Sequence, residues 1–147
     1  MSSHRIYEEK HDIDTDNTKN FYDQRAKNIG NMSSPYVAVL LGDQDPQHAV
    51  DWNTFEKTFI LPQLKVNKSS SVLDIGCGIG RWAESIIPEA GYYLGTDFSG
   101  EMIKIAQQRC SFENADYDFI NVSFQEACRR SSESSQRAAR RIAAYRH

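Results

Sequence analysis

The sequence predicts an α/β fold, in which three parallel strands alternate with helices after an N-terminal helical region. Three apolar runs of strand length indicate this: SVLDI at 71–75, YYLGTD at 92–97 and YDFINVSF at 117–124. Segments of helical composition separate them, and a turn with three glycines, GCGIG at 76–80, follows the first run. Strands that alternate with helices pair in parallel through right-handed crossovers.

The N-terminal region is expected to hold a leader and a helical cap. Residues 1–17 are polar and charged, which predicts a flexible leader. Helical composition begins at 18–28, and the apolar run at 35–46 fits either a short helix or an extended segment. We assign residues 18–68 to the cap. Its longest helical pattern is 48–64, where an amphipathic helix is indicated by Val50, Trp52, Phe55, Phe59 and Ile60.

Two helices are expected between the strands. The first begins at Gly80 and stops at Pro88, because proline cannot continue a helix. The second has Ser99 as its N-cap and carries an apolar side made of Met102, Ile103 and Ala106.

The glycine turn contains more glycines than a tight strand-to-helix turn requires. Glycine permits positive φ and lets a ligand approach the backbone, so the turn predicts a binding loop. A dinucleotide fingerprint, G-x-G-x-x-G/A, fits Gly78, Gly80 and Ala83 but starts two residues after the strand. Counted from Gly76, its last position is Arg81, whose bulk opposes close packing of helix and strand.

Two aspartates flank this loop. Asp74 ends the first strand, where a carboxylate would repel a pyrophosphate but suit a ligand with an ammonium group, such as S-adenosylmethionine. Asp97 ends the second strand, 23 residues later, where an acidic residue can hold ribose hydroxyls. Asp97 therefore indicates a nucleoside without choosing between the two cofactors.

The segment VLDIGCGIGRW resembles the first motif of the class I S-adenosylmethionine-dependent methyltransferases, and YYLGTDFSGEMIKIAQQR looks like their second strand and following helix. The resemblance covers residues 71–109. It implies the N-terminal half of a Rossmann-like methyltransferase fold, with residues 69–128 as a partial S-adenosylmethionine-binding domain.

The resemblance also implies a set of cofactor contacts. Phe98 and Met102 would line the adenine, although both also fit plain core packing, and Glu126 would accept a hydrogen bond from the adenine amino group. Gln125 stands where the family often has glycine, and a solvated carboxylate is the alternative for Glu126. The implied cofactor-binding residues are Asp74, Gly76, Cys77, Gly78, Gly80, Asp97, Phe98, Met102 and Glu126.

A lid over the cofactor is expected from residues 18–28. Tyr22 and Arg25 lie three residues apart, on one helical face. In similar small-molecule methyltransferases an aromatic residue here closes over the cofactor, and Arg25 would meet the methionine carboxylate or an anionic substrate. Helix packing and a solvated charge are the alternative. No catalytic base is identified, because the four histidines, His4, His11, His48 and His147, are distant from the loop in sequence.

Composition changes abruptly after Cys128. Residues 129–147 hold six arginines and one glutamate, whereas the preceding 128 residues hold eleven basic and nineteen acidic side chains. Similar methyltransferases have seven strands, and only 23 residues follow Phe124. We therefore expect a truncated or frame-shifted methyltransferase with impaired activity; a basic tail for an acidic partner and a half-domain completed by another chain are alternatives. The first strand would then be an exposed edge that promotes self-association.

The remaining expectations concern location and partners. Three cysteines, Cys77, Cys110 and Cys128, lack metal-ligand spacing, and no apolar segment reaches the ~18 residues of a membrane span or forms a secretory signal. These features predict a cytoplasmic protein that binds neither metal nor membrane. The predicted function is methylation of a small molecule, without nucleic acid. A non-catalytic nucleotide- or partner-binding fragment and a dinucleotide-dependent oxidoreductase are the alternatives.

Overall fold

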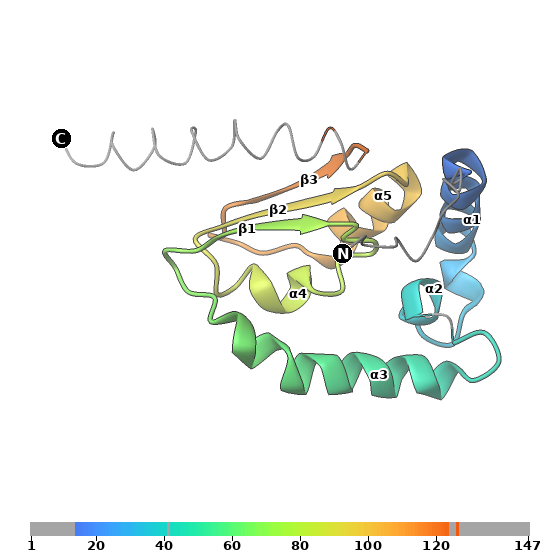
Figure 1. The fold of residues 1–147 in the computed structure, drawn as a ribbon, viewed down its shortest axis with the longest axis horizontal. Coiled ribbons are helices and arrows are strands. Elements are labelled where there is room, and N and C mark those ends of the chain that lie inside the picture. Colours follow the sequence, from blue (N-terminus) through green and yellow to red (C-terminus); the bar gives the residue numbers. More distant parts are fainter. Residues whose placement is uncertain (1–13, 41, 124–125, 127–147) are drawn as a thin grey trace, which may run out of the picture.

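The fold is a three-stranded parallel sheet with helices, seen in a computed structural model that describes residues 14–40, 42–123 and 126 (Figure 1). The strands β1 (Ser71–Ile75), β2 (Tyr92–Asp97) and β3 (Tyr117–Asn121) lie in the order β1-β2-β3. Both pairs are parallel, so the predicted α/β fold is confirmed. Within the described residues, β1 is an edge strand, and its Ser71 and Ile75 are exposed.

The helices α4 (Ala83–Ile86) and α5 (Gly100–Arg109) connect the strands. α4 is a single turn and is shorter than the predicted segment. The side chains of both helices pack with Tyr93 and Phe119 of the sheet in the main apolar core. Its buried members are Cys77, Ala83, Ile86, Ile87, Ala90, Tyr93, Ile103, Ala106, Cys110 and Phe119.

The cap region consists of α1 (Thr15–Lys27), η1 (Ile29–Asn31), α2 (Val37–Leu40), α3 (Pro46–Phe59) and η2 (Leu61–Leu64). α1 begins three residues before the expected start, because the Asp14 carboxylate accepts the Asn17 N–H at 2.9 Å and caps the helix. Within the ambiguous run at 35–46, a one-turn helix, α2, forms at Val37–Leu40. Most of the predicted leader and the whole basic tail lie outside the described residues.

α1 lies beyond the carboxyl ends of the strands (Figure 1). It packs on α5 and α2 through a second apolar cluster, in which Ala26, Ala38, Ile79 and Met102 are buried. This cluster joins the cap to the glycine turn and to α5. The arrangement places one face of α1 above the end of β2.

α3 presents its apolar side chains to solvent, which differs from the usual orientation of an amphipathic helix. Its buried residues are Ala49 and Asn53, and it is held to the rest of the fold by the ion pairs Lys57–Glu84 and Arg81–Glu56. The small Ala49 permits close approach of the loop at Gly42. The exposed large residues on this helix and its end are Trp52, Phe55, Phe59 and Ile60. In the described part of the chain, no helix combines the length and apolar character needed to cross a membrane.

Candidate functional site

The glycine turn after β1 has the backbone conformation that its composition predicts. Gly76, Gly78 and Gly80 have φ values of +78°, +54° and +76°, all in the left-handed region that favours glycine. The backbone N–H groups of Gly76 and Cys77 both donate to the Thr96 carbonyl, at 2.7 and 2.9 Å. The turn is thereby fixed to the end of β2.

The three glycines face different surroundings. A Cβ atom at Gly80 would lie 3.0 Å from Cys110 Sγ, so this glycine allows the turn to pack on α5. At Gly78 a Cβ would lie 3.1 Å from Val39 Cγ1. At Gly76 it would meet nothing within 4 Å, so a ligand can reach the backbone there. Cys77 is buried and offers its backbone rather than its thiol.

Asp97 fastens the turn to the start of α5. Its Oδ2 accepts the Gly78 N–H at 2.9 Å, and its Oδ1 accepts the Ser99 N–H at 2.8 Å. Asp97 is only 8% exposed, and this burial raises the pKa of its carboxyl although the two N–H donors lower it. Each carboxylate oxygen has a further lone pair, so Asp97 can also accept from a ribose hydroxyl.

Asp74 is held at the end of β1 by a buried tyrosine. Asp74 Oδ2 accepts the Tyr93 hydroxyl at 2.6 Å. Burial raises the pKa of the Asp74 carboxyl, and the Tyr93 hydrogen bond and the charge of Arg81 act in the opposite direction. Tyr93 was not among the predicted site residues. The period of two does offer a signal, because Tyr93 pairs with Val72, which shares a sheet face with Asp74.

Phe98 and Met102 lie near α1, at the end of β2. The Phe98 ring is half-buried and stands edge-on to the Tyr22 ring, with centroids 6.3 Å apart. Met102 is 1% exposed and belongs to the cluster beneath α1. Both residues thus have a packing role, and their contact with adenine stays a prediction.

The two predicted lid residues are placed differently. Tyr22 points toward the turn after β2, where it contacts Phe98. Arg25 instead donates to the Val37 and Ala38 carbonyls at 2.5 and 2.9 Å and pairs with Asp43 at 2.9 Å. Arg25 therefore links α1 to α2. Its contact with the methionine carboxylate of the cofactor or with an anionic substrate remains a prediction.

Glu126 and the histidines are the remaining candidate site residues. The Glu126 N–H donates to Ser123 Oγ at 3.4 Å, and the residues on both sides of Glu126 lie outside the described ranges. His48 is exposed and stacks on Trp52, whereas the other three histidines fall outside the described chain. Within the described residues, no group of three or more His, Cys, Asp or Glu side chains is arranged to hold a metal ion.

Comparison with known proteins shows similarity to methyltransferases. Residues 72–142 match the family described as a methyltransferase domain. The structure is similar to Haemonchus contortus phosphoethanolamine N-methyltransferase 1, solved with phosphoethanolamine and S-adenosylhomocysteine, at 27% identity and a TM-score of 0.56 over 71% of this chain. A methyltransferase from Anabaena variabilis matches 76% of this chain and 41% of its own, at 20% identity and a TM-score of 0.43. No curated protein matches significantly.

The chain spans about a fifth of the Haemonchus protein (21%). The family match starts in β1 and contains the glycine turn, β2 and α5, which are the segments that carry the methyltransferase resemblance, and it continues through β3. Over residues 72–142, this chain is similar to the methyltransferase-domain family.

Proposed function

We propose that this chain carries the S-adenosylmethionine-binding part of a methyltransferase that acts on a small molecule. The observation behind the proposal is the pair of carboxylates, Asp74 and Asp97, at the ends of adjacent parallel strands beside a turn of three left-handed glycines. Ligands of open α/β sheets bind at this edge of the sheet.

The residues present fit this cofactor. Asp74 would accept from the ammonium group of the methionine moiety, and Asp97 from the ribose hydroxyls. The open face of Gly76 leaves room for the ligand against the backbone. When bound, S-adenosylmethionine supplies a methyl group on a sulfonium, and methyl transfer depends on orientation and exclusion of water. Tyr22 on α1, which contacts Phe98, would help to exclude water.

A small methyl acceptor is supported by the similar Haemonchus enzyme, which was solved with phosphoethanolamine. A cytoplasmic location is part of the same proposal, and the unpaired thiols of Cys77 and Cys110 suit a reducing compartment.

A dinucleotide-dependent oxidoreductase is less well supported. Arg81, which stands where the dinucleotide fingerprint needs a small residue, pairs with Glu56 at 2.6 Å and lies over the Trp82 ring at 4.8 Å. Arg81 therefore links the glycine turn to α3 through Glu56. Moreover, the half-buried Asp74 carboxylate would repel a pyrophosphate bound at the turn.

A non-catalytic nucleotide- or partner-binding role is the second candidate. β1 is an edge strand of the described sheet, with Ile75 42% exposed, and its one charged side chain, Asp74, accepts the Tyr93 hydroxyl. β1 contains no proline and no further charge to oppose pairing with another strand. We propose self-association through this edge. Light scattering at increasing protein concentration tests it, and a monomer at all concentrations would contradict it.

Calorimetry tests the cofactor. We expect S-adenosylhomocysteine to bind more tightly than NAD⁺, and tighter binding of NAD⁺ would overturn the proposal. Transfer of a labelled methyl group to phosphoethanolamine, used as a probe, separates an enzyme from a binding protein. Binding of S-adenosylhomocysteine without methyl transfer to any of a panel of small amines and acids would favour the second candidate.

A further inference from the structure

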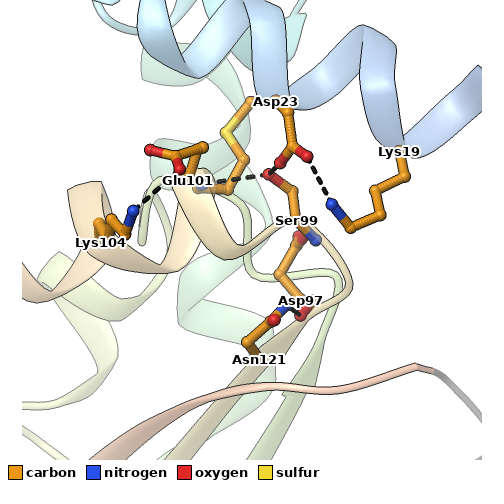
Figure 2. Close-up of polar contacts among 8 residues, drawn as sticks. Lys19, Asp23, Asp97, Ser99, Glu101, Lys104 and Asn121 are labelled. Carbon is orange, nitrogen blue, oxygen red and sulfur yellow. Dashed lines mark hydrogen bonds and ion pairs between the residues drawn. The ribbon is translucent and has the colours of Figure 1, made fainter.

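Helix α1 of the cap is linked to the turn between β2 and α5 by a hydrogen bond between residues 76 positions apart. Asp23, in the middle of α1, accepts the Ser99 hydroxyl on its Oδ1 at 2.5 Å (Figure 2). A backbone hydrogen bond from Glu101 also acts on the Asp23 carboxylate, and apolar contacts around Ala26 and Met102 hold α1 on α5. Apolar contacts are non-directional, whereas the Ser99–Asp23 hydrogen bond selects one position of α1 along α5.

Three hydrogen bonds of Ser99 link α1, α5 and Asp97. Besides donating to Asp23, its Oγ accepts the Met102 N–H at 3.1 Å and so caps α5. Its backbone N–H donates to Asp97 Oδ1 at 2.8 Å. Ser99 is fully buried, so the three contacts hold one another in place. A single residue therefore joins α1, α5 and the aspartate assigned to the ribose.

The acceptor at Asp23 is a charged carboxylate. Its Oδ2 pairs with Lys19 Nζ at 2.5 Å, one turn earlier in α1, and it lies near the first turn of α5 at Glu101. Burial raises the pKa of the Asp23 carboxyl, but the hydrogen bonds from Lys19 and Ser99 outweigh it, so the pKa lies below its ordinary value. Hydrogen bonds to an ionised acceptor are roughly twice as strong as neutral ones.

We propose that Asp23 is a positioning residue, which fastens α1 to the β2–α5 turn through Ser99 and makes α1 docking and cofactor binding depend on each other. The inference rests on the proposed cofactor. Tyr22, the neighbour of Asp23, contacts Phe98, so docking of α1 also sets the aromatic wall at the end of β2. Coupling between sites is reciprocal: whatever α1 adds to cofactor affinity, the cofactor adds to α1 docking.

Hydrogen exchange on the full chain, with and without S-adenosylhomocysteine, tests the coupling. In Asp23→Ala the amides of α1 should exchange about tenfold faster in the free protein, and affinity for S-adenosylhomocysteine should fall three- to tenfold by calorimetry. The ligand should still protect the glycine turn but no longer protect α1. Asp23→Asn, which keeps an acceptor oxygen, should recover part of both effects.

Asp16→Ala is the matched control, because Asp16 is an exposed aspartate on the same helix. It should leave both readouts within twofold of the wild type. Faster α1 exchange in Asp23→Ala with unchanged affinity and intact ligand-induced protection of α1 would overturn the coupling and leave a structural contact. A wild-type chain that binds no S-adenosylhomocysteine would overturn the proposed function together with the coupling, whereas normal binding with an unresponsive α1 overturns the coupling alone.

Discussion

Replacement of Asp97 by alanine should destabilise the fold even without cofactor. The substitution leaves the Gly78 and Ser99 N–H groups without their acceptor, in a site where Asp97 is 8% exposed. A buried donor that loses its acceptor costs about 1–3 kcal/mol, so we expect a loss of about 2–6 kcal/mol for Asp97→Ala. Asp97→Asn keeps one acceptor oxygen and should cost about half as much.

Urea unfolding followed by circular dichroism at pH 7 measures both variants. Asp118→Asn, at an exposed aspartate on β3, is the control and should change stability by about 0.5 kcal/mol or less. Burial of the Asp97 carboxylate acts against these hydrogen bonds, because it destabilises the charged form and so raises the pKa of Asp97. If the cost of burying the charge exceeded the stabilisation from the two hydrogen bonds, Asp97→Ala would unfold at the same or a higher urea concentration than the wild type. That result would refute the reasoning.

Because Asp97 also holds the glycine turn in place, its replacement can weaken cofactor binding indirectly. Asp97→Ala is expected to disturb the glycine turn, so weaker binding of S-adenosylhomocysteine would not by itself identify a ribose contact. Asp97→Asn is the better test because it retains one link. In that variant a loss of roughly 1.5–3 kcal/mol of binding energy per charge-assisted hydrogen bond, with the fold intact, would support the ribose assignment.

Three further predictions follow from the described contacts. Gly95→Ala should lower the free energy of unfolding by about 1–3 kcal/mol, since its Cβ would lie 2.7 Å from the Phe119 ring; Gly30→Ala, with open space, is the control in thermal unfolding. Burial raises the pKa of Cys110 to about 11, so iodoacetamide at pH 8 should label it slowly until urea unfolds the chain. Because the pKa of Asp23 is lowered from 3.8, its stabilisation of α1 is present above pH 3.8 and is lost as pH falls through the folded-state pKa; α1 exchange in Asp23→Ala should lack this acid step.

Local patterns in the sequence were enough to predict the three strands, the positive φ values of the glycine turn and the Ser99 cap. Each depends on residues that are neighbours in the chain: β1 and β2 are short apolar runs, and a serine before a helix accepts the N–H three residues later. The methyltransferase resemblance rests on these same segments, which is why it could be stated before the fold was known.

The tertiary structure decided which way side chains face and which partners they find. The aromatic residues of α3 face solvent because Ala49 and the Arg81–Glu56 ion pair hold the opposite side of the helix against the fold. Arg25 donates to the carbonyls of α2, whereas Asp23, one residue after the predicted lid tyrosine, accepts the Ser99 hydroxyl. Such contacts join segments up to 76 residues apart, and local propensity contains no information about which of many possible packings brings them together.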